Sequence, residues 1–270
     1  MINYTERIAL LMQDVVARTP RLAFIDLKEV IVFARSGRSD AEGAFATCHC
    51  LTLPESEPGY FFWRDRESGV LTRRSPWFVT KSPHVRVGST RIKYLISFVL
   101  PRFIDQTLIG SRKADLYDSV EPFIAKLDTI VHELYHIDPA DGGLRAVENA
   151  DGSRSYRTHG PMFYEDVAQM VREYLATRPD PALYDFLRHD FDELSARHGG
   201  VVGTTFSNFP SFPQRYMETV DLPGADGSVK IEPLQGPNQP DLSTEDHLHI
   251  RQFTGVSARR LTRKGRHCAA

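Results

Sequence analysis

Residues 121–136, which read EPFIAKLDTIVHELYH, decide how this chain folds. Apolar residues recur in this stretch every three or four positions, which predicts an α-helix with one buried face. The buried stripe consists of Phe123, Ile124, Leu127, Ile130, Val131 and Leu134. We expect the helix to open at Glu121-Pro122, because a first helical turn tolerates proline. We expect it to end near Asp138-Pro139, because the residue before a proline avoids helical geometry.

The last turns of this helix carry a His-Glu-x-x-His motif. His132 and His136 are four residues apart, so they share a helix face and can present two imidazoles to one metal ion. Glu133 lies one step round the helix, within reach of water at that metal. The arrangement is typical of zinc hydrolases, in which the Glu acts as general base. Because a helix can carry these residues without a metal, the motif alone is not proof of a zinc site.

A catalytic zinc site usually has three protein ligands, so one more is needed from elsewhere in the chain. His159 is the best candidate, because it stands next to Gly160 at a bend just before another helix. Glu148, Glu165 and Asp166 are the alternatives, and a Glu on the following helix would define another class of zinc peptidase.

Further polar residues can serve such a site in two ways. A tyrosine hydroxyl can donate to the oxyanion that forms during hydrolysis, and Tyr156, Tyr164 and Tyr174 are all candidates. A carboxylate can hold the second nitrogen of a ligand imidazole, and Asp138 or Asp141 could do so. The sequence does not choose among them.

The two motifs together resemble a known family. The strings VHELYHI at 131–137 and HGPMF at 159–163 look like the signature of SprT-like zinc metallopeptidases, which is H-E-x-x-H, a loop, then H-G-x-x-F. The string HELYHIDP and the strand-rich region before it are similar to phage metallopeptidases related to SprT. The resemblance covers residues 90–178 well and 1–90 loosely, and it does not cover the C-terminal third.

This resemblance implies a function and a fold. His132, His136 and His159 would be the Zn²⁺ ligands, and Glu133 would be the catalytic general base. The implied fold is α+β, a zincin-like core in which a small mixed or antiparallel sheet packs against the motif helix and the helices that follow. The best-understood members of the family cleave proteins attached to DNA, but the elements that bind DNA lie outside the matched region.

The other elements are predicted from periodicity and from Pro and Gly positions. We expect helices at 4–18 (capped by Asn3 or Thr5), 161–177 and 181–198, a hairpin of strands at 22–34 and 43–53, short strands at 60–63, 77–80 and 84–87, and a weak strand at 247–253. Residues 91–100 fit either a strand or a short helix. Residues 1–206 would form the metallopeptidase domain, and residues 207–270 a loop-rich C-terminal extension with a basic tail.

Composition limits the partners and the compartment. The net charge of −2 gives no global field that favours nucleic acid or membrane. Three cysteines do not suggest a disulfide scaffold, and we expect a cytoplasmic protein without a membrane segment. Cys48-His49-Cys50 could bind a second metal together with Cys268, although buried thiols are the commoner reading. DNA could bind through the basic tail 255–267, or through basic and aromatic residues at 64–93, which a sheet explains equally well.

We therefore expect a zinc-dependent endopeptidase that cleaves a protein substrate, with nucleic-acid-associated proteins as one candidate class. One alternative is a non-catalytic zinc-binding phage protein, either structural or associated with nucleic acid. Another is a metal-dependent toxin or defence effector with one protein target. All three would use the same site residues, so activity separates them.

Overall fold

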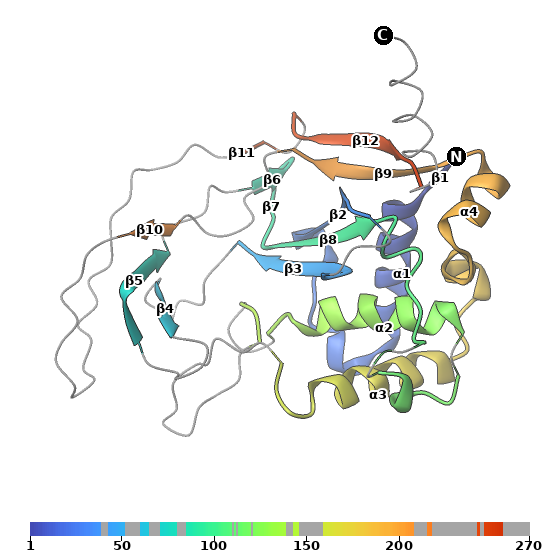
Figure 1. Cartoon of the computed structure of the whole chain (residues 1–270), viewed down its shortest axis with the longest axis horizontal. Coiled ribbons are helices and arrows are strands. Elements are labelled where there is room, and N and C mark those ends of the chain that lie inside the picture. Colours follow the sequence, from blue (N-terminus) through green and yellow to red (C-terminus); the bar gives the residue numbers. More distant parts are fainter. Residues whose placement is uncertain are drawn as a thin grey trace, which may run out of the picture.

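The structure is a computed structural model that describes most of the chain (Figure 1). It describes residues 1–38, 43–51, 85–109, 111, 113–119, 121–138, 143–145, 159–207 and 246–255 in full, and four strands by their backbone alone. Those four strands are β4 (Tyr60–Arg64), β5 (Leu71–Val79), β10 (Arg215–Met217) and β11 (Leu242–Ser243). The described elements combine helices with small mixed sheets, so the fold class is α+β, as expected.

The strand β8 (Tyr94–Leu100) is the middle strand of the sheet that carries the main core. It pairs in parallel with β2 (Val30–Ser36) and antiparallel with β3 (Ala46–Cys50). All of its residues are buried, because side chains cover both faces of the sheet. A strand buried on both faces reads as a continuous apolar run, which is why its pattern also fitted a short helix.

The predicted hairpin of 22–34 with 43–53 is wrong. β2 and β3 lie on opposite sides of β8 and do not pair with each other. The first of these strands also begins later than predicted, because residues 20–29 contain two short 3₁₀ turns, η1 (Pro20–Leu22) and η2 (Leu27–Glu29). Asp26 caps η2 by accepting a hydrogen bond from the Lys28 N–H at 3.0 Å. The apolar run of β8 takes the central place because it alone must be buried on both faces.

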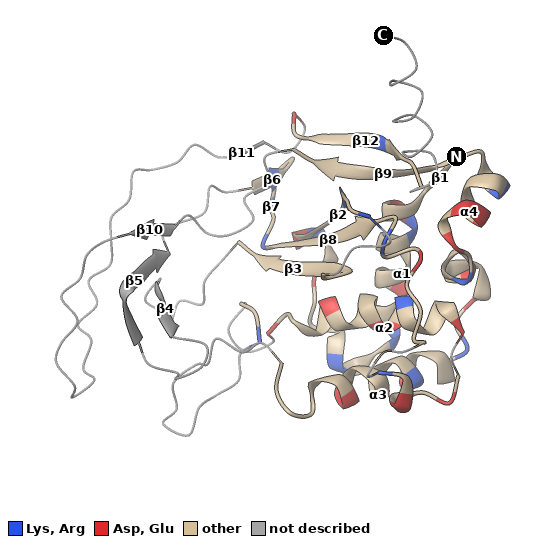
Figure 2. Ribbon diagram, viewed as in Figure 1, with Lys and Arg blue, Asp and Glu red and all other residues tan. Residues whose placement is uncertain are grey.

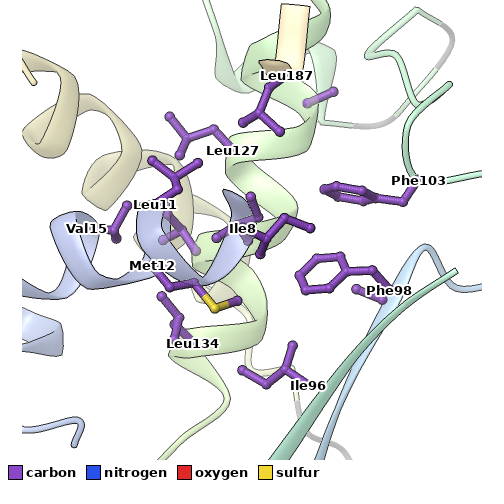
Figure 3. Close-up of a cluster of buried hydrophobic side chains, with 14 of the residues drawn as sticks. Ile8, Leu11, Met12, Val15, Ile96, Phe98, Phe103, Leu127, Leu134 and Leu187 are labelled. Carbon is purple, nitrogen blue, oxygen red and sulfur yellow. The ribbon is translucent and has the colours of Figure 1, made fainter. Parts of the chain in front are cut away.

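Two helices cover one face of this sheet, and a third packs against one of them. The helix α1 (Tyr4–Arg18) has the predicted bounds, and the Asn3 side chain caps it by accepting a hydrogen bond from the Glu6 N–H. The helix α2 (Pro122–Tyr135) contains the motif, and α3 (Phe163–Ala176) packs beside it. Figure 3 shows where α1 and α2 meet the sheet. The labelled side chains that gather there are Ile8, Leu11, Met12 and Val15 of α1, Leu127 and Leu134 of α2, Ile96 and Phe98 of β8, Phe103 and Leu187.

The motif helix α2 lies deeper than an ordinary amphipathic helix. It starts at Pro122 as predicted, and nearly all of its residues are buried, including the polar residues Lys126, Asp128 and Glu133. Buried polar groups need hydrogen-bond partners, so these three positions require specific contacts. The helix ends at Tyr135, and His136 forms its C-cap.

The predicted helix at 181–198 is broken in two places. The chain instead forms η4 (Pro181–Leu183), η5 (Asp185–Arg188) and a shorter helix α4 (Phe191–His198). Asp190 starts α4 through a reciprocal capping box with Glu193, and this favours a new helix over continuation of the old one. Gly199 ends α4 at a positive φ of 70°, where glycine has no steric penalty.

A second sheet joins the two ends of the described chain. Its strands are β1 (Ile2–Asn3), β9 (Val201–Phe206) and β12 (Leu248–Phe253), with β9 in the middle. β12 pairs antiparallel with β9 although its residues were assigned to the C-terminal extension. The boundary predicted at residue 206 therefore runs between two paired strands. Gly203 of β9 lies so close to Ala34 and Thr5 that an added Cβ would be 3.3 Å from each.

The remaining described strands form two small sheets. β5 pairs with β4 and β10, and β6 (Val85–Val87) pairs with β7 (Thr90–Arg91) and β11. A further 3₁₀ turn, η3 (Ala114–Leu116), precedes α2. Within the described part of the chain, no helix has the length and apolar character needed to cross a membrane.

Candidate metal centre

Three histidines converge at the C-terminal end of α2. His132 lies in the last turn of the helix, His136 is its C-cap residue, and His159 comes from the segment just before α3. The Nε2 atom of His132 is 3.2 Å from that of His136 and 3.1 Å from that of His159. One ligand nitrogen from each of the three residues lies within 4.8 Å of the other two, close enough to bind one metal ion.

The nitrogen spacing is compatible with a shared metal ion. Ligands on tetrahedral Zn–N bonds of about 2.0–2.1 Å stand about 3.3 Å apart, near the observed separations. Burial lowers the pKa of His136 to about 3, with the charges of His159, Arg145 and Lys113 acting in the same direction. The imidazole is therefore neutral, which is the form that binds metals. Among the described residues, the buried Nδ1 of His136 has no hydrogen-bond partner, so Nε2 carries its polar contact.

Phe163 brings the three rings together. Its buried ring lies 4.9 Å from His132, 5.0 Å from His136 and 4.7 Å from His159, measured between centroids. A tight turn aims it, in which the Phe163 N–H donates to the Gly160 carbonyl at 3.1 Å. The bend expected at Gly160 thus directs both His159 and Phe163 towards α2.

Glu133 follows His132 on α2, and the edge of the sheet holds its side chain. Its side chain is buried, and its carboxylate accepts a hydrogen bond from the backbone N–H of Cys48 on β3. Burial raises the pKa of Glu133 to about 8, while the Cys48 N–H and the positive charges of Lys113 and Arg35 oppose the rise. The carboxylate of the residue that follows His132 is therefore fixed against the edge of β3.

Lys113 is the residue at this centre that pattern reasoning missed. It comes from the segment between β8 and α2, and its ammonium group forms an ion pair with Asp128, which is fully buried on α2. The Tyr117 hydroxyl donates to the other oxygen of Asp128 at 2.6 Å. The ammonium also lies 5.5 Å from the ring centre of Tyr164, and that ring stacks on His159 at 5.4 Å. No local pattern marks Lys113, because its partner is on another element.

A second cluster fixes the end of α2. The Tyr135 hydroxyl donates to Asp166 at 2.9 Å, and Arg21 contacts both of these groups. The Arg145 guanidinium lies 4.2 Å from the Tyr135 ring centre and donates through Nε to the Tyr135 carbonyl. The Arg145 backbone N–H donates to the His136 carbonyl at 2.7 Å. These bonds satisfy the last carbonyl groups of the helix and hold its two histidines in place.

The other predicted site residues differ in whether they lie near the three histidines. Tyr164 lies against His132 and His159, as a residue of the centre should. The prediction for Tyr174 is wrong, because its hydroxyl donates to Asp14 of α1 at 2.8 Å and its side chain is fully buried in that contact. Asp138 lies past the helix end, where its N–H donates to the Gly143 carbonyl.

The structure describes two of the alternatives for the third ligand, and neither lies in the histidine group. Glu165 is exposed on α3 and is not in the metal-binding group, and Asp166 binds Arg21 and Tyr135 instead. Glu148, Tyr156 and Asp141 lie outside the described residues, as does the tail 255–267.

The cysteine motif on β3 does not form a second cluster in the described part of the chain. Cys48 and Cys50 alternate with His49 along the strand, and His49 lies on the opposite face, 3.4 Å from the Ser97 hydroxyl. Cys268 lies outside the described residues, and His132, His136 and His159 are the single group of potential metal ligands found within them.

Of the basic residues at 64–93, Lys93 forms an ion pair with Glu29 at 2.8 Å.

No protein-family model matches the chain, and comparisons with curated proteins and with solved structures give no match either. The SprT-like resemblance therefore rests on the two motif strings themselves.

Proposed function

We propose that this chain is a zinc-dependent endopeptidase of the SprT-like type with a zincin-like core. The observation that carries the proposal is the convergence of three Nε2 atoms next to a buried glutamate that is held at a strand edge. The metal-binding geometry alone would suit many functions. The adjacent carboxylate is what adds hydrolysis to it.

Zinc is the metal that this ligand set favours. Imidazole nitrogens suit zinc, copper, iron and nickel, and three histidines with one open position are a common catalytic zinc arrangement. His132, His136 and His159 would hold the ion. When bound, zinc supplies Lewis acidity, which lowers the pKa of water to about 7 and polarises a carbonyl oxygen.

Glu133 supports proton transfer in this proposal. Glu133 would act in its ionised form, which a nearby dication favours by opposing the effect of burial on its pKa. One carboxylate oxygen would then take a proton from the attacking water and later deliver it to the leaving amide nitrogen. The Cys48 N–H orients the carboxylate, so it needs little rearrangement before it reacts. Tyr164 is the remaining candidate among the described tyrosines for donating a hydrogen bond to the oxyanion, since its ring lies against two of the ligands.

The edge of β3 offers a place for an extended protein substrate. The backbone groups of Phe45 and Leu51 form hydrogen bonds with Val99 and Lys93, on the side of β3 that faces β8. Backbone groups alternate in direction along an antiparallel strand, so those of Cys48 point to the other edge of β3. Within the described residues no strand pairs with that edge. A peptide that added to it would pass beside Glu133, and main-chain hydrogen bonds would hold the peptide there.

The test combines metal analysis with a protease assay. Purified protein should contain about one zinc per chain by mass spectrometry, and should cleave casein or histones with or without single-stranded DNA present. Glu133→Gln should retain the zinc and lose at least about 10²-fold of the activity, as expected for removal of a general base. Zinc-loaded protein that cuts no peptide bond under any of these conditions would refute the proposal.

A further inference from the structure

Three cationic side chains in the described part of the chain act on the centre. Lys113 and Arg35 act on Glu133, and Lys113 and Arg145 act on His136. The carboxylates close to them are Glu133 itself and Asp128. With a bound dication, the centre would carry clear excess positive charge.

This local charge contrasts with the rest of the molecule. The chain has a net charge of −2, and Figure 2 shows acidic and basic residues interspersed along α2, α3 and α4. The positive field is therefore a property of the centre and not of the surface as a whole. Such a field favours a ligand that brings negative charge to this place.

Lys113 is the cation best placed to meet that ligand. Asp128 holds the ammonium group of Lys113, and Tyr117 in turn holds Asp128. Lys113 is therefore already ordered and loses little side-chain entropy when a ligand binds. An ammonium group has three N–H donors, and one carboxylate oxygen accepts only one of them in this pair. About 16% of the Lys113 side chain remains exposed, and its ammonium group lies 5.5 Å from the centre of the Tyr164 ring that stacks on His159.

We propose that Lys113 determines specificity by binding an acidic side chain of the substrate next to the bond that is cleaved. This inference rests on the proposed peptidase function. An acidic peptide fits better than a nucleic acid, because phosphate backbones are bound by several exposed cations along a groove. Lys113 is a single and mostly covered cation.

The binding test uses two fluorescein-labelled peptides, one of alternating Glu and Ala and one of alternating Gln and Ala. Their affinities for zinc-loaded Glu133→Gln protein are compared by fluorescence anisotropy, and again after removal of metal with EDTA. We expect the Glu peptide to bind about tenfold more tightly, which corresponds to one hydrogen bond between charged groups. Lys113→Met should reduce the preference to less than about twofold, and Lys113→Arg should keep most of it.

Matched variants separate charge recognition from folding. Lys93→Met removes a cation that is paired with Glu29 away from the centre, and it should leave the preference unchanged. Lys113→Met leaves the buried Asp128 with Tyr117 alone, so the double variant Lys113→Met/Asp128→Asn repeats the test without an unpaired carboxylate. Equal binding of the two peptides by the parent protein, or a preference that survives in the folded double variant, overturns the inference.

Two further outcomes distinguish this inference from the proposed function. If casein is cleaved but the cut sites and the binding show no acidic preference, the inference fails and the peptidase stands. If nothing is cleaved but the Glu peptide is preferred through Lys113, the peptidase fails and the anion subsite stands. Binding of an oligo(dT) probe through Lys113, with no preference for the Glu peptide, would also overturn the inference.

Discussion

Lys126 is a buried cation on the motif helix, and its replacement by methionine should change how stability depends on pH. Only 1% of the residue is exposed, and its ammonium group donates to the His189 carbonyl at 2.7 Å. Burial lowers the pKa of Lys126 from 10.5 to about 8, while the negative charges of Asp105, Asp190 and Glu193 oppose the change. The ammonium thus fastens α2 to the segment before α4, at an electrostatic cost.

The size of that cost follows from the pKa. The lowering of the Lys126 pKa corresponds to about 3 kcal/mol of folding free energy, as an upper bound. Below pH 8 the lysine is charged in both states, so the folded protein bears the whole cost. Between pH 8 and 10.5 the unfolded chain binds more protons than the folded one, so the free energy of unfolding rises with pH.

Lys126→Met removes this dependence. At pH 7 the variant escapes the cost of burying a charge, but it leaves the His189 carbonyl without its donor, which costs about 1–3 kcal/mol. The two effects nearly cancel, so the informative quantity is the change with pH. From pH 7 to pH 10 the variant should lose about 2 kcal/mol relative to the parent protein.

Urea denaturation of both proteins at the two pH values measures this difference. All other titrating groups are shared by the two proteins, so their contributions cancel in the comparison. Lys93→Met, at a partly exposed surface ion pair, should show almost no pH-dependent difference. A stability difference between Lys126→Met and the parent that stays constant from pH 7 to pH 10 would refute the reasoning.

Three further variants test the centre and the packing behind it. His159→Ala should leave the fold intact and lower the zinc content measured by mass spectrometry, because two imidazoles remain; undiminished zinc would mean that another residue is the third ligand. Tyr174→Phe should lower the free energy of unfolding by about 1–2 kcal/mol through the lost bond to Asp14, with activity unchanged. Tyr164→Phe should instead lower kcat about 10²-fold with little effect on stability, and equal kcat losses in the two tyrosine variants would exclude this assignment.

The parts of the site that the sequence predicted correctly are those set by local geometry. His132 and His136 share a face because a helix has a fixed period, and the bend at Gly160 aims His159. Tyr174 shows how a residue type can mislead when its position is ignored. It belongs to the apolar stripe of α3, so its hydroxyl meets α1 instead of the metal centre.

The parts that could not be predicted depend on contacts between distant segments. Lys113 meets Asp128 only because the segment after β8 folds back over α2, and no spacing rule links the two positions. The same holds for β2 and β3, whose strand character was predicted but whose pairing was not. Two strands that follow each other in sequence favour a hairpin, but the strand that can be buried on both faces took the place between them.

The contacts around the three histidines also explain why the centre is formed by the chain itself. Phe163 touches all three rings, Tyr164 stacks on His159, and the bonds of Arg145 fix the last carbonyl groups of α2. Each contact orders a histidine side chain in the metal-free protein. The entropy cost of ordering these side chains is therefore part of the free energy of folding and not of metal binding. The same rigidity leaves the three imidazoles little room to separate, and their nitrogen atoms are held close enough to bind one metal ion.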